Sequence, residues 1–327
     1  MPCHEDQNDQ QGETQRDGED EHALTKALSR AASVAGNQSF DHDICTENRP
    51  GGSRLRMELE QRWNDLILAS SSGISVAGHT RYGGNKAEND DCLPTSNTPA
   101  SWFQEIYDRH TEPGRYYHTV VHLWECFELL DIVIFNLKES TWYAPMAWSV
   151  FFHDSIYDPK SNRNEKDSAE LFRAFVNDCM SSAMGKTTFN SVLTMILATE
   201  KHKVILPSEG SREMPKKDEL EEIMMQKHFL DIDMAVLGKQ QGAYFKYAAL
   251  IRKEYEFVPH DVYCSKRAEI LETFLGGSSG ASDSSMNKTG QKKYIYLTDS
   301  FQGAFEDRAR GNLRNEVSLL RKNTIPG

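Results

Sequence analysis

The sequence predicts an all-α protein, and three observations lead to this fold class. Apolar residues recur at helical spacing through most of the chain, no segment shows sustained alternation with hairpin turns, and polar or glycine-rich stretches separate the periodic segments. We find no convincing strand and no repeat of fixed period. A helical bundle is therefore the expected architecture.

The periodic segments follow one another from residue 57 onward. In the first, residues 57–69, Leu59, Trp63 and Leu66 fall on one face of a helix. The later segments are 101–112, 116–137, 143–158, 164–180, 187–203, 218–238, 242–258, 262–275 and 301–323. Pro145 suits the first turn of its helix, where a missing N–H costs nothing.

Charge is distributed unevenly along the chain. Residues 1–50 hold 11 acidic and four basic side chains, a net charge of −7 out of −12 for the whole protein. Such a segment buries too little apolar surface to offset its ordering entropy, so we expect residues 1–56 to be a disordered acidic tail or, alternatively, a partner-binding segment. The expected helical domain covers residues 57–323, with insertions at about 70–99 and 276–293.

Composition argues against several classes of protein. A pI near 5.4 argues against general nucleic-acid binding, which needs a basic surface. No apolar run approaches the roughly 18 residues of a membrane span, and the acidic start resembles neither a secretory signal nor a transit peptide. The six cysteines are scattered without a CxxC pair, as in proteins with reduced thiols. We therefore expect a cytoplasmic protein without a membrane partner.

Four short pieces carry imidazole or carboxylate groups into apolar surroundings. They are RYYHTVVH (115–122), FFHDSIYD (151–158), LATEKHK (197–203) and FLDIDMAVLG (229–238). Each alone has an ordinary structural explanation, such as a satisfied core histidine or acids that cap a helix. His118 and His122, however, are four apart and share a helix face, and the adjacent His153 and Asp154 would be costly to bury unpaired. Taken together, the pieces indicate a metal site.

The order of these motifs resembles the HD-domain superfamily of predicted metal-dependent phosphohydrolases. The blocks RYYHTVVH, AWSVFFHDSIYDPKSNRNEKDSA, ATEKH, FLDIDMAVLG and YFKYAALIRKEYEFVPHDVYCSKRAEILETFL occur in the order typical of that family. The resemblance extends over residues 57–323 and implies an HD-domain helical bundle with extra C-terminal helices. It also implies hydrolysis of a phosphate ester of a small metabolite, with nucleotides as the commonest substrate class.

The resemblance implies a set of metal ligands. His122 matches the first ligand, His153 and Asp154 match the HD pair, and Asp233 matches the distal aspartate. Asp231 is the competing choice for the last position, because the DID segment offers two carboxylates. Mixed nitrogen and oxygen ligands without thiolate suit Mn, Mg, Co, Ni, Fe or Zn. Such an ion activates water and polarises a phosphoryl oxygen, and Asp154 is also a candidate base for that water.

The YHTVVH segment is also similar to the YHNxxH motif of cyclic-nucleotide phosphodiesterases. In that family the first histidine protonates the leaving oxygen, which makes His118 a candidate general acid. Thr119 stands where that family has asparagine, so the match is partial. Cyclic-nucleotide phosphodiesterase activity is therefore an alternative function.

Four further residues have both a functional and a structural interpretation. Glu165 can orient water or hold a second ion, or it can cap a helix. Ser168 is similarly open: it can contact the substrate, or it can cap the same helix. His202 can bind a second metal or phosphate, or end a helix. Arg115 can bind a phosphate with two hydrogen bonds, or form a surface ion pair.

The C-terminal blocks contain arginines and aromatic residues that we interpret as structural. Arg252 and Arg267 are expected to form ion pairs, and the aromatic stripe that includes Tyr244 and Tyr247 is expected to belong to the core. Two other functions remain open. An HD-fold di-iron oxygenase would use His118 and His202 to complete a two-metal site, and a non-catalytic nucleotide sensor would bind without turnover.

Overall fold

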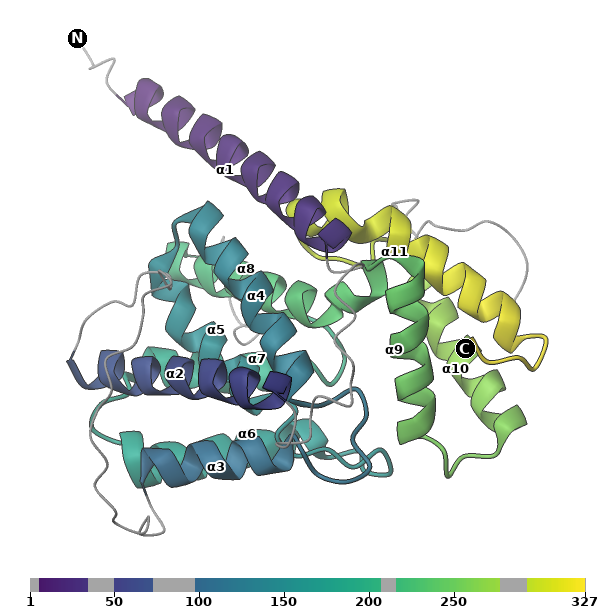
Figure 1. The fold of residues 1–327 in the computed structure, drawn as a ribbon. Helices are drawn as coiled ribbons and strands as arrows, with labels where there is room; N and C mark the ends of the chain where they lie inside the picture. Colours follow the sequence, from purple (N-terminus) through teal and green to yellow (C-terminus); the bar gives the residue numbers. More distant parts are fainter. Residues whose placement is uncertain (1–5, 35–49, 73–97, 207–215, 277–292, 327) are drawn as a thin grey trace.

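The computed structural model describes residues 6–34, 50–72, 98–206, 216–276 and 293–326, and every regular element within them is a helix (Figure 1). The all-α prediction is therefore confirmed for the described part of the chain. Each expected periodic segment corresponds to a helix, two of them extended by a short π-helical or 3-10 turn. The expected insertions at about 70–99 and 276–293 lie almost entirely outside the described residues.

Seven helices form the bundle that contains the metal-site motifs, in the left part of Figure 1. They are α2 (Pro50–Ser72), α3 (Pro99–Arg109), α4 (Val120–Leu137), α5 (Ser140–Phe152), α6 (Asn164–Phe175), α7 (Lys186–Ala198) and α8 (Lys217–Met234). Helix α4 packs on α5 and α8, and α5 also packs on α7. Helices α4, α5 and α8 therefore share the centre of the bundle.

A second group of helices follows at the right of Figure 1. It consists of η3 (Ala235–Gly238), α9 (Gln241–Glu254), α10 (His260–Leu275) and α11 (Asp299–Leu320). A Cβ on Gly238 would lie 2.6 Å from the Phe305 side chain, so only glycine allows η3 to approach α11 so closely. This contact joins the end of α8, which carries the DID segment, to the C-terminal helices.

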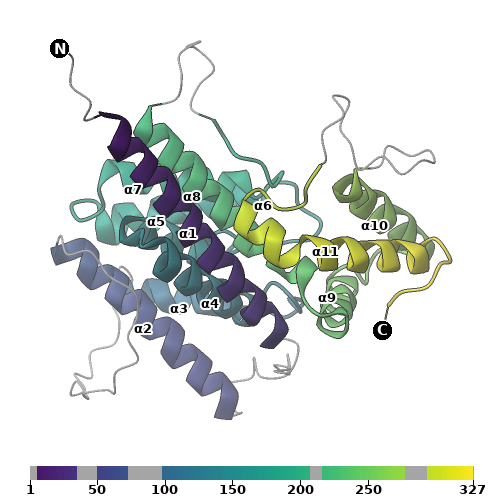
Figure 2. The same ribbon diagram turned by 90° about the horizontal axis from the view of Figure 1, so that it is seen from above.

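The N-terminal region departs from the expected disorder. Residues Asp6–Val34 form helix α1, and residues 50–56 belong to α2. Leu24, Leu28 and Ala32 are spaced by four residues and are almost fully buried, because α1 lies against α11 and α4 (Figure 2). The acidic composition concealed this narrow apolar stripe. Residues 35–49 of the expected tail lie outside the described residues.

The bundle core is built around Trp63 of α2. Its ring contacts Trp148, Phe151 and Phe175 at centroid distances of 5.0–5.2 Å, and its indole N–H donates to a backbone carbonyl. Pro145 lies inside α5 rather than in its first turn, because the helix begins at Ser140. The aromatic core fixes the end of α5, where His153 follows.

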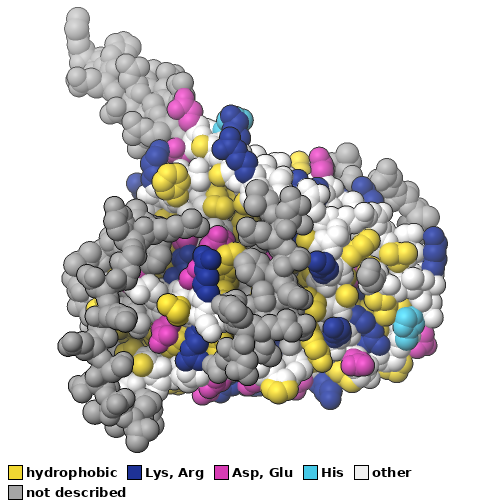
Figure 3. Space-filling view, in the orientation of Figure 1, with side chains coloured by type: hydrophobic (Ala, Val, Ile, Leu, Met, Phe, Trp, Pro, Cys, Tyr) yellow, Lys and Arg dark blue, Asp and Glu magenta, His cyan; other side chains and the backbone are white. Residues whose placement is uncertain are grey.

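The surface mixes charge types. On the face drawn in Figure 3, basic and acidic side chains lie among apolar ones over the right part of the molecule, where Figure 1 shows α9 and α10. Within the described residues, no helix combines the length and apolar character that crossing a bilayer requires.

Candidate metal centre

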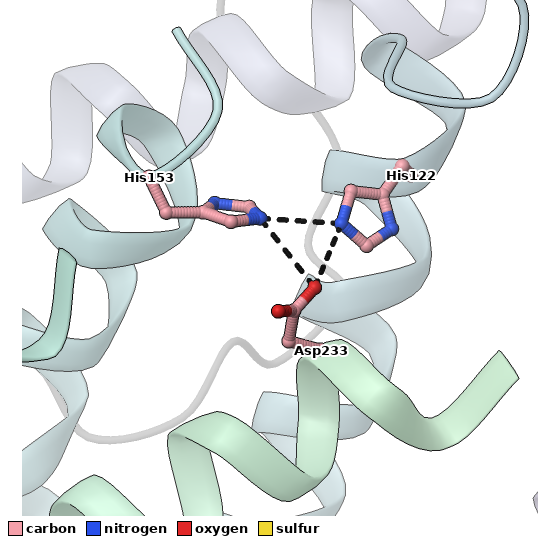
Figure 4. A group of neighbouring side chains, drawn as sticks. All are labelled: His122, His153 and Asp233. Atoms are coloured by element: carbon pink, nitrogen blue, oxygen red, sulfur yellow. Dashed lines mark hydrogen bonds and ion pairs between the residues drawn. The ribbon is translucent and has the colours of Figure 1, made fainter. Parts of the chain in front are cut away.

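Two histidines from different helices face each other at the centre of the bundle. His122 lies in the first turn of α4, and His153 directly follows the last residue of α5. Their Nε2 atoms are 3.2 Å apart and both side chains are almost fully buried (Figure 4). Two imidazole lone pairs at this distance repel each other, so the pair requires a shared proton or a cation.

The tautomer of His153 directs one nitrogen to this centre. Its Nδ1 lies 3.0 Å from the carbonyl oxygen of Val150, which can only accept, so Nδ1 carries a proton. Its Nε2 faces carboxylate oxygens of Asp154 at 3.1 Å and Asp233 at 3.7 Å. Burial alone would lower the pKa of His153, but these carboxylates raise it well above its usual range. Positive charge is therefore strongly favoured at this position.

The two aspartates of the DID segment, Asp231 and Asp233, have different partners. Asp233 Oδ1 lies 3.2 Å from His122 Nε2 and belongs to the group that can hold an ion. Asp231 points elsewhere and accepts hydrogen bonds from the backbone of Leu297 and from both the backbone and hydroxyl of Thr298. Burial raises the pKa of Asp231 to about 7 despite these bonds. The geometry therefore favours Asp233 over Asp231 as the metal-facing residue.

Asp154 approaches the same centre from the loop after α5. Its Oδ2 is 3.1 Å from His153 Nε2 and 3.8 Å from His122 Nε2. Burial would raise the pKa of Asp154, but the positive charge favoured on His153 lowers it, so the carboxylate stays ionised. The expected ligand set His122, His153, Asp154 and Asp233 thus comes together in one place.

Arg115 and Ser168 hold this loop rather than face the centre. The buried Arg115 guanidinium donates to the carbonyl oxygens of Asp154 at 2.6 Å and Ser155 at 2.9 Å. The buried Ser168 hydroxyl accepts from the backbone N–H of Ile156 at 3.0 Å. Both side chains were expected to bind substrate, with a surface ion pair or a cap as the alternative. Their polar groups fix the backbone that presents Asp154, and Arg115 also forms an ion pair, the alternative expected for it, with Glu112 at 3.6 Å.

His118 is oriented by a carboxylate distant in sequence. Its Nδ1–H donates to Oε2 of Glu254 at 2.7 Å, while Oε1 of Glu254 accepts the backbone N–H groups of Tyr116, Tyr117 and His118. The Tyr157 hydroxyl donates to the same carboxylate at 2.9 Å, and its ring stacks on His118. Burial would lower the pKa of His118, but Glu254 raises it. His118 therefore holds a proton more tightly than an ordinary histidine.

His202 reaches the site from the turn after α7. Its Nε2–H donates to Oδ2 of Asp233 at 3.1 Å, the oxygen that does not face His122. The residue adopts a φ of +48°, an uncommon conformation for a side chain larger than glycine. This backbone conformation accompanies the approach of the imidazole to Asp233, where it can steady the carboxylate or share a second ion.

Glu165 lies in the first turn of α6, where its negative charge interacts favourably with the positive end of the helix dipole. In the described part of the chain, no hydrogen bond or ion pair links it to the metal-facing side chains. The structure thus gives direct support only to its helix-terminal interpretation.

The donor atoms fit a divalent cation. One atom each from His122, His153 and Asp233 lies within 4.8 Å of the others, and the distances between histidine Nε2 atoms and carboxylate oxygens at the centre are 3.1–3.8 Å. Ligands at about 2.1 Å from an ion, at right or tetrahedral angles, lie roughly 3.0–3.4 Å apart. His122 Nδ1 is 3.2 Å from the Tyr117 hydroxyl, the kind of outer contact that orients a ligating imidazole. The site needs only small adjustments to hold an ion.

Sequence reasoning missed Glu254, Tyr157 and Tyr117. Glu254 stands two residues from the exposed Glu256, and nothing local distinguishes the two acids. Only the packing of the end of α9 against residues 116–118 reveals its role. Arg267 forms the expected ion pair, with Glu316 at 3.0 Å, and Tyr244 is fully buried as expected. Arg252 donates to the backbone carbonyl oxygens of Tyr255 and Val258 instead of forming the expected ion pair with a described acid.

Comparison of the chain with protein-family models, with curated proteins and with solved structures finds no match.

Proposed function

We propose that this protein is a metal-dependent phosphohydrolase that hydrolyses a phosphate ester of a small metabolite, with nucleotides as the first class to test. The observation that carries the proposal is that His118 lies next to the metal-facing group, by which we mean the side chains of His122, His153, Asp154 and Asp233. Tyr117 contacts the rings of both His118 and His122, at centroid distances of 5.0 Å. A proton donor therefore stands beside a site that favours positive charge.

Each residue of the site has a defined task in this proposal. His122, His153, Asp154 and Asp233 would hold the ion, which when bound supplies an activated water and polarises a phosphoryl oxygen. His118, which keeps its proton because of Glu254, would donate it from Nε2 to the departing alkoxide oxygen. Glu254 and Tyr157 fix the ring of His118, and Arg115 fixes the loop of Asp154.

The need for a proton donor favours esters over anhydrides. An alkoxide is a poor leaving group that gains much from protonation, whereas a departing phosphate is already stable as an anion. The raised pKa of His118 keeps the donor form populated near neutral pH. Phosphomonoesters are therefore the substrates that this arrangement suits best.

Cyclic-nucleotide phosphodiesterase activity is the second candidate. The orientation of His118 by Glu254 favours it, since cleavage of a cyclic diester also releases an alkoxide that needs a proton. Paired assays on cyclic and linear phosphates with the same base distinguish the two activities.

The direct test is a screen of phosphorylated metabolites after chelation, with Mn, Mg, Co, Ni, Fe and Zn added in turn. We expect metal-dependent phosphate release by the wild type. Asp154→Ala should lose at least about 100-fold of this activity, because the variant lacks a ligand and the candidate base. Asp108→Ala removes an exposed acid on α3 and is the matched control. Full activity in a folded Asp154→Ala protein would refute the assignment.

A further inference from the structure

An exposed aromatic side chain lies where two loops of the site region meet. One loop follows the HD pair and contains Lys160; the other follows Glu254 and contains Phe257. The Phe257 side chain is 50% exposed, and the Lys160 ammonium lies 4.8 Å from the centre of its ring. One loop thus begins directly after Asp154 and the other directly after Glu254, and both of these residues belong to the candidate site.

Both loops are held in place by polar contacts. Arg252 donates to the carbonyl oxygens of Tyr255 and Val258, which flank Phe257. On the other loop, the backbone N–H of Lys160 donates to the Asp158 carboxylate at 2.9 Å. Phe257 is therefore presented to solvent by a fixed backbone. A rigid, solvent-facing ring is preorganised for stacking, since little conformational entropy is lost on binding.

Aromatic contacts connect Phe257 to the proton donor. The ring of Tyr255 stacks on Phe257 with a centroid distance of 6.0 Å and an interplanar angle of 27°. The side chain of Tyr255 lies near that of Tyr157, whose ring stacks on His118 at 4.1 Å. The exposed ring thus stands at the outer end of a continuous series of side chains that begins at His118.

The charge around Phe257 is complementary to that of the centre. Asp154, Asp233 and Glu254 make the centre acidic, whereas Lys160 is exposed and forms no ion pair with a carboxylate in the described segments. The Lys160 ammonium over this half-exposed ring adds a positive charge that favours electron-rich planar groups, through cation–π attraction and stacking together. Sugars and short alkyl chains gain little from such a surface.

We infer that Phe257, with Lys160 beside it, is a specificity-determining surface that stacks on a planar ring carried by the substrate. The inference rests on the proposed function for the placement of the substrate's phosphate at the metal-facing group. It adds that the alcohol part of the ester bears an aromatic or heteroaromatic ring, and that this ring lies on Phe257 while the phosphate lies near His118.

The test compares two phosphate esters that differ only in a planar group, adenosine 5′-monophosphate and ribose 5-phosphate. Equilibrium binding to the metal-loaded full chain is measured by calorimetry for the wild type, Phe257→Ala and Phe257→Trp. We expect the wild type to prefer the nucleotide by about tenfold. Phe257→Ala should lose this preference without weakening ribose 5-phosphate binding, and Phe257→Trp should retain it.

Phe135→Ala is the matched control. Phe135 is 80% exposed on α4, 13 residues from His122, which corresponds to about 20 Å along the helix. This variant should keep the wild-type preference. Equal affinities of the wild type for the two probes, including binding of neither, would overturn the inference. An equal loss for both probes in Phe257→Ala would overturn it as well.

Binding and turnover separate this inference from the proposed function. A preference that depends on Phe257, in a protein that hydrolyses no ester with any of the six metals, supports the stacking surface and contradicts the phosphohydrolase. Hydrolysis of both probes with equal KM values supports the phosphohydrolase and overturns the stacking surface.

Discussion

The imidazole Nδ1 of His118 lies 2.7 Å from Oε2 of Glu254, although 136 residues separate the two in the sequence. The carboxylate also accepts three consecutive backbone N–H groups from residues 116–118. One buried acid therefore fixes both the backbone and the ring of the candidate proton donor. The second helical group thus contributes to a site whose candidate metal ligands all lie in the first.

Replacement of Glu254 should change the pH dependence of activity. A donor acts only while it is protonated, so activity falls as pH rises through the pKa of His118. Glu254→Gln removes the charge that raises this pKa, and the alkaline limb should move to lower pH, with kcat reduced by about 100-fold. NMR titration of His118 provides a readout independent of activity. An unchanged His118 titration would rule out this role, and Glu256→Gln is the control on the same segment.

Removal of the Tyr117 hydroxyl should weaken metal binding. This oxygen is the partner of His122 Nδ1 at 3.2 Å, and loss of such an outer contact typically costs about 10-fold or more in metal affinity. We expect Tyr117→Phe to bind the metal about tenfold more weakly, as measured by competition with a chelator. Tyr263→Phe is the matched control, because the buried Tyr263 hydroxyl has no hydrogen-bond partner in the described structure. Equal metal affinities for the two variants would argue against a part for Tyr117.

The sequence predicted the bundle and much of the centre for physical reasons. The HD and DID segments were recognisable because acids are rare in apolar surroundings. The expectation that His118 and His122 share a helix face was wrong, because α4 begins at Val120 and His118 precedes it. The sequence did not separate Asp231 from Asp233, since two acids two residues apart leave a helix in different directions and only their partners distinguish them. Packing alone decides that Leu297 and Thr298 bind the first of these acids.

Tertiary packing also explains where the structure differs from the sequence predictions. Arg115 and Ser168 have polar groups suited to phosphate, but folding commits them to backbone groups around Asp154. The N-terminal segment was interpreted from its average charge, whereas its burial depends on three residues spaced by four. Average composition does not detect so narrow a stripe when the rest of the helix is acidic.

The packing of α1 can be tested by shortening one buried side chain. Leu24 is fully buried, and Leu24→Ala should lower the free energy of unfolding by about 3 kcal/mol. Lys26→Ala alters an exposed residue of the same helix and should leave stability within about 0.5 kcal/mol of the wild type. Urea denaturation measures both. A Leu24→Ala protein as stable as the wild type would show that α1 does not pack as described.

His228 should make the fold sensitive to acid. Its Nδ1–H donates to a carbonyl oxygen of α8 while its Nε2 is buried without a partner, and burial lowers its pKa to about 4. Unfolded chains protonate histidine near pH 6.5, so stability should fall as pH drops from about 6.5 to 4, by roughly 3 kcal/mol in total. His228→Leu should remove this share of the pH dependence, and His22→Leu, at an exposed position, should not. Urea denaturation at pH 7, 5.5 and 4.5 gives the change of stability with pH. An identical pH dependence for the wild type and His228→Leu would contradict the explanation.

The central claim is that His122, His153, Asp154 and Asp233 hold a divalent cation. The most direct measurement is calorimetric titration of the chelated protein with each of the six metals, for the wild type, Asp233→Asn and Asp231→Asn. We predict that the wild type binds at least one of the ions with release of protons, since His153 must lose one. Asp233→Asn should lose this binding, and Asp231→Asn should bind the ion but unfold more easily. Failure of the wild type to bind any of the ions, or undiminished binding by Asp233→Asn, would contradict the account.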